Sequence, residues 1–425
     1  MKSFINGLSH PKIINTILLV AFFIPFLIYS IFIFRYAVNI PYQDDYDVVL
    51  NFINTFIQMQ TLEEKTALLF SQHNEHRIVF DRIVFLCYYY LFHEVNFIFF
   101  IIFGNLGWLL TIITLILYLK NNSKFSFAYL LPIPYILLLP VHHENMFFAM
   151  AAIQNYWFIF FVVIFLICLS KDKKILFFAL FPIALFTSGG GIILYLLGNL
   201  FLLLRKKWQS LALFFILSTY FMVLYFHGYD KPPYHPDIFE TALNPLRATV
   251  YFFTFLGNIF IVPLSELSLL TGFILCALSA YFIFIKQKED DYFWKLVICF
   301  VVLITLTTTL TRSGFGIRQA VVSRYSLFPL LVLVCVYVFI ISSISNTAAA
   351  YRIILIFAIS FWVINAFLIE RNHFFLKMKE TRISSIVAFS HGDKTSLLYP
   401  NQDRAAQILL TAERQHVYSY QDQIP

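Results

Sequence analysis

Long apolar runs recur along this chain, and they limit the folds it can adopt more than any other feature. The run at 97–119 contains no charged residue, and a transmembrane helix needs about 20 predominantly apolar residues. The whole chain is 60% hydrophobic and 12% charged, with a mean hydropathy of +0.78, whereas soluble proteins carry about 25% charged residues. The sequence therefore predicts an all-α polytopic membrane protein and excludes soluble, secreted and disordered proteins.

We expect eleven transmembrane helices. The expected spans are 13–34, 97–119, 127–139, 146–169, 175–186, 191–204, 211–226, 269–285, 293–310, 327–341 and 353–369. The apolar segment 249–262 is expected to be re-entrant or interfacial, because only then do the basic clusters all face the cytoplasm, as positively charged loops do. Those clusters begin at Lys120, Lys171, Arg205 and Lys286.

This topology defines the parts of the protein. Residues 1–369 form a polytopic transmembrane domain whose N-terminus is cytoplasmic, and the loop at about 35–96 is external and contains interfacial helices. Residues 370–425 form a small external tail with an amphipathic helix at 403–414, where apolar residues recur at helical spacing. The net charge of +7 is explained by the cytoplasmic loops, so we expect no nucleic-acid partner.

Titratable residues gather on the predicted external side. Asp44, Asp45 and Asp47 follow the first span at once. Carboxylates this close repel one another, so a cation must compensate for them or one must stay protonated. A general base, a pair of metal ligands or both would use this arrangement, and the alternative is that one aspartate caps the following helix.

A second polar segment contains His73, Glu75, His76 and Arg77. Its spacing differs from the H-E-x-x-H pattern of zinc proteases. Arg77 and the histidines suit phosphate groups or sugar hydroxyls, and Glu75 is a further candidate metal ligand beside the aspartates. The alternative is a polar belt at the membrane interface.

Two further external segments are candidates for substrate or metal binding. One contains His142, His143 and Glu144, although a helix cap is the alternative for the glutamate. The other contains Gly189 and Gly190 at the expected start of a helix, where backbone N–H groups bind anions. A tight turn is the alternative for the glycines.

Three arginines, Arg312, Arg318 and Arg324, lie close together in a later external segment. External arginines do not contribute to the cytoplasmic excess of positive charge, whereas the planar guanidinium group suits a phosphate. These residues are therefore candidate phosphate-binding residues, and snorkelling to lipid headgroups is the alternative.

An acidic pair just after the first transmembrane helix, in an external loop of a many-spanning chain, resembles the GT-C superfamily of membrane glycosyltransferases. These enzymes take a sugar from a polyprenyl-phosphate donor on the non-cytoplasmic face. The size, the Phe- and Ile-rich composition and the external tail look like those of bacterial O-antigen-modifying glucosyltransferases. The resemblance implies that Asp44 or Asp45 is the catalytic carboxylate and that Arg324 contacts the donor phosphate.

The resemblance also implies inverting transfer of a sugar, such as glucose, to a cell-surface glycan such as O-antigen. Adjacent residues of a helix point in different directions, and we favour Asp45 as the base that faces the cleft, with Asp44 as a cap or metal ligand. The expected partners are the polyprenyl-phosphate-linked sugar donor, a lipid-linked or surface glycan acceptor, and membrane lipids. The cofactor is left open, with a divalent cation (Mg or Mn) as one candidate. The expected location is the bacterial inner membrane, with the active site and the tail in the periplasm.

Two other functions are compatible with the sequence. An O-antigen polymerase resembles this chain in composition, but such enzymes place their arginines in large mid-chain external loops. A transporter or flippase of lipid-linked sugars needs charged or broken helices near the membrane midplane. The polar residues within the predicted spans are neutral and scattered.

Overall fold

The computed structural model of the protein describes residues 11–122, 126–233, 235–262, 264–284, 292–343 and 347–424. Within these ranges the chain consists of helices and connecting segments, with no β-strand. Helices are the structure that apolar runs require in a bilayer, because every backbone polar group must find its partner within the chain. The predicted all-α membrane class is confirmed at this level. The basic cluster predicted at Lys286 lies outside the described residues.

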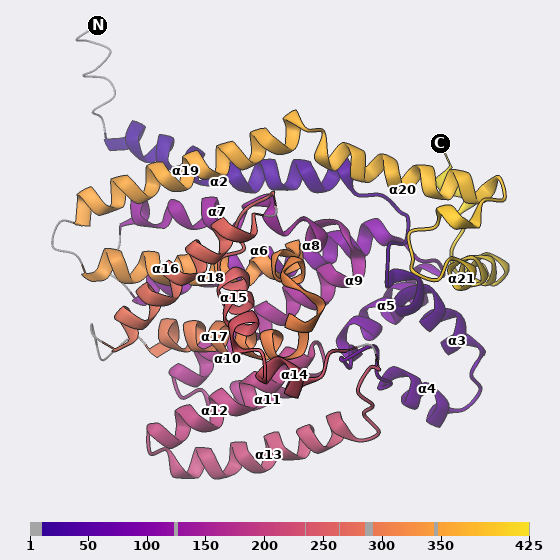
Figure 1. Cartoon of the computed structure of the whole chain (residues 1–425), viewed down its shortest axis with the longest axis horizontal. Helices are drawn as coiled ribbons and strands as arrows, with labels where there is room; N and C mark the ends of the chain where they lie inside the picture. The colour runs from indigo at the N-terminus through magenta and orange to yellow at the C-terminus, as the bar shows by residue number, and fades with distance from the viewer. Residues whose placement is uncertain are drawn as a thin grey trace, which may run out of the picture.

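Eight helices of the described ranges are long and apolar enough to cross a membrane. They are α2 (Pro11–Tyr36), α6 (Phe97–Asn122), α10 (Phe158–Ser170) continued backwards through η4 (Ala152–Trp157) and α9 (Ala149–Ala151), α13 (Trp208–Phe226), α16 (Ser265–Phe284), α17 (Tyr292–Arg312), α18 (Leu327–Ser343) and α19 (Thr347–Arg371). Figure 1 shows the long helices lying side by side in one bundle.

Three of the eleven predicted spans are not confirmed, because their helices are short. The segment 127–139 divides into η2 (Phe127–Leu130) and α7 (Pro132–Leu137), where prolines remove backbone donors. The predicted spans 175–186 and 191–204 form α11 (Lys174–Leu185) and α12 (Ile192–Leu204). At 1.5 Å per residue each is about 20 Å long, whereas the hydrocarbon core is about 30 Å thick.

The segment 249–262, expected to be re-entrant or interfacial, lies mostly in α15 (Pro245–Leu256), which is not one of the eight long helices. The chain before it, in α14 (Ile238–Ala242), accepts a hydrogen bond at Thr241 from the Ser313 hydroxyl. The chain after it donates from Asn258 to the Val322 carbonyl. The residues before and after α15 therefore both contact the segment that follows α17.

The basic loops meet at one end of the bundle. The Lys171 ammonium lies 4.9 Å from the centre of the Tyr118 ring, and that ring packs 4.4 Å from the ring of Phe293. The Arg205 guanidinium lies 4.4 Å from the ring of Tyr292. The C-terminal ends of α6, α10 and α12 and the start of α17 therefore share one end of the bundle, which we call the basic end.

The first loop and the tail meet at the opposite end, which we call the loop end. Their elements are η1 (Tyr46–Asn51), α3 (Phe52–Gln58), α4 (Leu62–Leu69), α5 (Val79–Phe92), α20 (Phe374–Ser390) and α21 (Gln402–Arg414). Figure 1 shows α3 and α4 on the same side of the bundle as α21 and the C-terminus. Gln43 donates its N–H to the Leu398 carbonyl, and Val95 donates to Val417.

The tail shares its core with the rest of the chain. Its amphipathic helix forms as predicted, and α21 buries Ala405, Ile408, Leu409 and Ala412 on one face. Leu409 and Phe375 belong to the same buried apolar cluster as the membrane helices, and the Phe375 ring lies 5.2 Å from that of Phe32 in α2. The tail therefore packs against both the first loop and the membrane helices.

Candidate functional site

The structure buries Asp45 and uses both of its oxygens. Asp45 is 1% exposed, and its carboxylate accepts N–H groups from Met150 at 2.9 Å and Tyr42 at 3.1 Å. Burial raises the pKa of Asp45 to about 7, although the two backbone hydrogen bonds and the charge of Arg382 act in the opposite direction. The prediction that Asp45 faces the cleft is wrong, because this side chain ties the first loop to the start of the third long helix.

Asp44 is the aspartate of the pair that reaches the surface. Its side chain is 33% exposed, and its Oδ2 lies 3.9 Å from Nε2 of His73. Burial acts to raise the pKa of Asp44, but the neighbouring His73 and the charges of Arg324 and His76 outweigh it and hold the pKa below its ordinary value. Asp44 lines a hollow of about 310 Å³ together with Asp47 and His73. An ionised and accessible carboxylate can accept a proton from a hydroxyl, although its lowered pKa makes it a weak base.

Asp47, predicted to bind substrate or metal, is engaged by the tail. The Arg404 guanidinium donates from Nη2 at 2.6 Å and Nε at 2.9 Å to Oδ1, and the Tyr399 hydroxyl donates to Oδ2. Neither aspartate of the acidic pair caps the following helix, since η1 has no side-chain cap. Asp47 therefore fastens α21 to η1, and its acceptor capacity is largely used.

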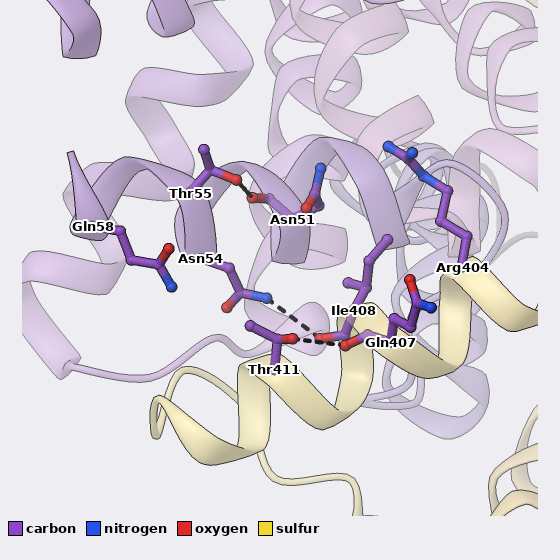
Figure 2. Close-up of a pocket in the computed structure, with 8 residues that line it drawn as sticks. All are labelled: Asn51, Asn54, Thr55, Gln58, Arg404, Gln407, Ile408 and Thr411. Carbon is purple, nitrogen blue, oxygen red and sulfur yellow. Dashed lines mark hydrogen bonds between the residues drawn. The ribbon is translucent and has the colours of Figure 1, made fainter.

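A second hollow of about 350 Å³ lies between α3 and α21 (Figure 2). Asn51, Thr55 and Arg404 line both hollows. The rest of the second lining comes from Asn54, Gln58, Gln407, Ile408 and Thr411. The two hollows therefore adjoin one another, and we call the one between α3 and α21 the groove.

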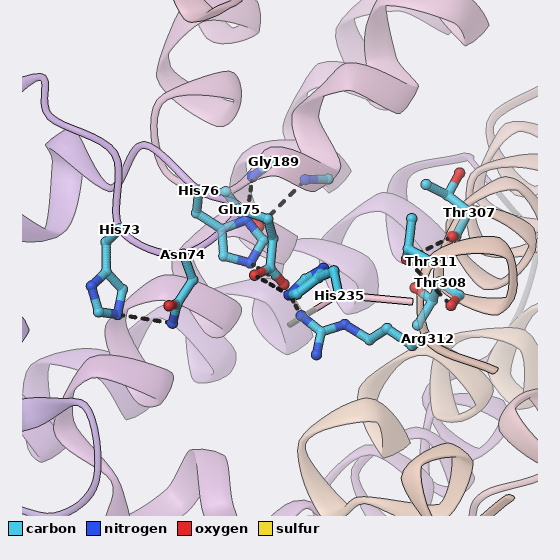
Figure 3. A network of polar contacts seen from close by, with 12 residues as sticks. His73, Asn74, Glu75, His76, Gly189, His235, Thr307, Thr308, Thr311 and Arg312 are labelled. Atoms are coloured by element: carbon cyan, nitrogen blue, oxygen red, sulfur yellow. Dashed lines mark hydrogen bonds and ion pairs between the residues drawn. The ribbon is translucent and has the colours of Figure 1, made fainter. Parts of the chain in front are cut away.

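A tight turn places His73 and His76 on different sides of the chain. The two residues exchange both backbone hydrogen bonds, at 2.8 and 2.9 Å, and Asn74 between them has a φ of 48°. Figure 3 shows the His73 ring apart from the Glu75 and His76 side chains, which point toward α17. His73 therefore belongs with Asp44, whereas Glu75 and His76 belong to a separate polar network.

Glu75 is the centre of that network. Its carboxylate lies 3.4 Å from Nε2 of His76 and 3.4 Å from Nε2 of His235, and it pairs with the Arg312 guanidinium (Figure 3). Arg312 was predicted to bind phosphate, but the structure pairs it with a carboxylate. The network connects the first loop to the 227–237 loop and the end of α17.

His76 is held neutral within this network. Desolvation, followed by the charges of His73, His235 and Arg324, lowers the pKa of His76 to about 3, although Asp44 acts in the opposite direction. Its Nδ1 accepts the N–H of residue 189 at 3.1 Å. In a neutral imidazole the other nitrogen then bears the hydrogen, and that nitrogen faces Glu75.

The glycine segment packs closely and does not offer free N–H groups. Gly189 donates to His76, and Gly190 donates to the Ser188 hydroxyl at 3.5 Å. A Cβ on Gly189 would lie 2.9 Å from the His76 ring, and one on Gly190 would lie 2.8 Å from the Phe158 ring. The anion site predicted at these glycines is not formed, because close approach occupies the space and the donors.

Arg77 is buried and donates hydrogen bonds to three backbone carbonyls. It is 7% exposed, and it donates to the carbonyl oxygens of Tyr225 at 2.6 Å, His227 at 2.5 Å and Phe70. The predicted contact with a donor phosphate is wrong for this residue, since its donors hold the end of α13 against the first loop.

Arg324 is the predicted arginine whose charge acts on the aspartate site. Its Nε lies 3.6 Å from Glu144 Oε2, and its side chain is 36% exposed. Its charge lowers the pKa of both Asp44 and His76. The Ser323 hydroxyl accepts the N–H of Glu144 at 2.9 Å, so the segment after residue 142 lies against η8 (Ser323–Ser326). Arg318 is exposed on η7 (Ile317–Val321).

Of the two histidines predicted at residues 142 and 143, the first lies inside the protein and the second is partly buried. His142 is fully buried, with Nδ1 2.8 Å from the Tyr156 hydroxyl and Nε2 3.2 Å from the Leu137 carbonyl. His143 packs its edge against the Phe374 ring. Burial lowers the pKa of each histidine to about 4. Neither of them lines the two hollows.

No metal-binding set is assembled in the described part of the chain, where no three His, Cys, Asp or Glu side chains are grouped to hold an ion. His73 and Asp44 face one another, but Asp47 is taken by Arg404 and Glu75 by its own network. These residues do not fit the candidate divalent cation, and we derive no step through one.

Three residues that contact the predicted site residues are not predicted from the sequence. Arg404 and Tyr399 come from the tail, and only the polar face of the predicted amphipathic helix pointed to that region. His235 lies in the loop after α13, and no motif in the sequence marks it. Comparison of the chain with protein-family models, curated proteins and solved structures finds no match.

Proposed function

We propose that this protein is a membrane glycosyltransferase of the bacterial inner membrane. It moves a sugar, such as glucose, from a polyprenyl-phosphate donor to a surface glycan such as O-antigen. The observation that supports this most is Asp44, an ionised, accessible carboxylate in a polar hollow at the loop end, beside His73 and within the field of Arg324.

In the proposed reaction Asp44 is the general base. A hydroxyl of the acceptor gives its proton to Asp44 while its oxygen forms a bond to the anomeric carbon of the donor sugar. The bond from that carbon to the phosphate oxygen breaks, and its electron pair leaves with the lipid phosphate. A single displacement of this kind inverts the anomeric configuration.

Arg324 and the Glu75 network have different roles in this proposal. Negative charge grows on the leaving phosphate, and a partly exposed guanidinium placed nearby stabilises it. The ion pair of Glu75 and Arg312 fixes the turn that presents His73 to Asp44. Glu75 and His76 are therefore positioning residues.

The proposed orientation puts the loop end in the periplasm and the basic end in the cytoplasm. It is supported by the separation of the two ends, because Lys171 and Arg205 lie at one end and Asp44 at the other. The lipid donor would approach along the membrane at the loop end.

The two alternative functions have weaker support. A polymerase would place several arginines in a large mid-chain external loop, whereas the segment between α13 and α16 contains one arginine, Arg247. A transporter would use polar groups inside the bundle, and Tyr29, Asn105, Tyr156 and His142 do form a hydrogen-bonded chain there. These groups satisfy one another, which favours a packing role.

The test is sugar transfer by the purified protein in detergent, with radiolabelled sugar on polyprenyl phosphate and surface glycan from cells that lack the gene. We expect labelled glycan with inverted configuration from wild type and none from Asp44→Asn. Absence of transfer by wild type contradicts the proposal. In cells, a missing sugar after gene deletion supports transfer, altered glycan length supports polymerisation, and an unchanged glycan argues against both.

A further inference from the structure

The groove between α3 and α21 has a lining of unusual chemistry. Its side chains are amides and hydroxyls, with one aliphatic residue and one arginine (Figure 2). The amides and hydroxyls are those of Asn51, Asn54, Thr55, Gln58, Gln407 and Thr411. An amide side chain offers both donors and an acceptor in one plane, so this lining matches groups that donate and accept at once, as sugar hydroxyls do.

The groove carries no net charge. Its one cation, Arg404, is neutralised by the two-pronged contact with Asp47. Asn54 is 3% exposed, and its side-chain N–H donates to the Ile408 carbonyl at 3.3 Å. The Oδ1 atom of the same amide has no hydrogen-bond partner. A buried acceptor without a partner costs about 1–3 kcal/mol.

The groove leads to the proposed base. Asn51, Thr55 and Arg404 belong to its lining and to that of the hollow that contains Asp44 and His73. The rings of Phe52 and Tyr399 also line that hollow, and aromatic faces suit the apolar faces of sugar rings. A chain of sugars lying in the groove would end beside the carboxylate.

We propose that this groove binds the acceptor glycan as an uncharged oligosaccharide segment and presents its terminal hydroxyl to Asp44. The direction of the chain and the reacting hydroxyl rest on the proposed glycosyltransferase function, whereas binding of a neutral oligosaccharide does not. The tail, through α21, is then one wall of the acceptor site.

The experiment fills the groove with a bulky side chain. Gln407 is exposed on α21 and lines the groove, so Gln407→Trp adds bulk there with little risk to folding. The matched control is Leu410→Trp, on the same helix at a position that is 39% exposed and not part of the lining. A second variant, Gln58→Leu, removes one amide from the opposite wall without adding bulk.

Two measurements are made on each protein in detergent. The first is binding of neutral oligosaccharides of four to eight sugars, compared with uronic-acid oligosaccharides of the same length. The second is the KM for surface glycan and for lipid donor in the transfer reaction. For Gln407→Trp we expect weaker binding of neutral oligosaccharides and an acceptor KM raised by about tenfold or more, equivalent to about 1.4 kcal/mol, with an unchanged donor KM. Leu410→Trp should match wild type.

The outcomes separate the groove from the reaction. If wild type transfers sugar but Gln407→Trp and Gln58→Leu keep the wild-type acceptor KM, the groove inference is wrong and the glycosyltransferase function stands. If wild type binds neutral oligosaccharides, loses them in Gln407→Trp and transfers nothing, the reaction is wrong and the groove is a carbohydrate site. Preference for uronic-acid oligosaccharides, or no oligosaccharide binding by wild type, overturns the inference.

Discussion

Replacing Asp44 and Asp45 one at a time by asparagine separates chemistry from folding. Asparagine keeps the size of the side chain and loses the ability to accept a proton. Asp44 is 33% exposed and faces His73, whereas Asp45 is 1% exposed and accepts two backbone N–H groups. The two substitutions are chemically identical, so different outcomes reflect the two environments.

The structure sets the size of each effect. Loss of a positioned general base costs about 10²–10⁴ in rate, which is about 3–5 kcal/mol of transition-state stabilisation. Asp44→Asn should show this loss with less than about 1 kcal/mol of destabilisation. The Asp44 side chain is partly exposed, and its partner His73 lies 3.9 Å away, so their interaction contributes little to stability. In Asp45→Asn one buried N–H loses its acceptor, which costs about 1–3 kcal/mol of stability, while transfer per folded molecule is kept.

The assay is the transfer rate at saturating donor and acceptor, normalised to the monodisperse fraction, with thermal unfolding measured on the same samples. Glu63→Gln, at an exposed carboxylate on α4 of the same loop, is the control and should change neither quantity. If Asp44→Asn keeps transfer within about threefold of wild type, Asp44 is not the base. If Asp45→Asn loses transfer without losing stability, the roles of the two residues are reversed.

Four further measurements follow from the structure. Arg324→Lys keeps the charge but loses the planar fork, so donor KM should rise by about tenfold at equal expression; an unchanged KM rejects the phosphate contact. Asp47→Asn removes the clasp on α21 and should speed proteolysis of the tail, at a cost of up to about 1 kcal/mol because the arginine is 53% exposed. The folded pKa of Asp45 is raised from 3.8 to about 7, so its stabilising contribution is complete below about pH 4 and is lost as the pH rises from there to about 7; the stability difference from Asp45→Asn should shrink between about pH 4 and 7. In a cysteine-free background, Gln60→Cys in the first loop should react with an impermeant thiol reagent in spheroplasts, and Gln209→Cys at the start of α13 should not; the opposite pattern inverts the orientation.

The sequence predicts the membrane helices well where an apolar run is long and uninterrupted. The run in α6 needs no tertiary information, because a charge-free stretch of that length has few other solutions. The sequence overestimates the number of spans where runs are short, as in α11 and α12, because hydropathy does not reveal where a helix ends. Residues 186–191 separate the two helices, and there Gly189 approaches the His76 ring closely, which is a tertiary contact.

The candidate site is predicted less completely, since residue type shows which groups are titratable but not which way they point. Arg77 and Arg324 look equivalent in sequence, yet one donates to three carbonyls inside the protein and the other is partly exposed near the aspartates. His142 likewise lies in a polar segment but bonds to Tyr156 within the bundle. Only the arrangement of neighbouring elements decides between these outcomes.

The three aspartates of the first loop show how one short segment acquires three roles. Their mutual repulsion requires compensation, and each aspartate has its own neighbours that lower its pKa or bind it. Arg382 of α20 acts on buried Asp45, and Arg404 of α21 binds Asp47. The pKa of Asp44 is lowered by neighbours outside the tail. Arg382 and Arg404 both belong to the tail, so the tail holds Asp45 and Asp47 and leaves Asp44 accessible. Loosening α21 should therefore reduce the order of the loop that presents Asp44, which makes the clasp at Asp47 a second route by which the tail affects the proposed reaction.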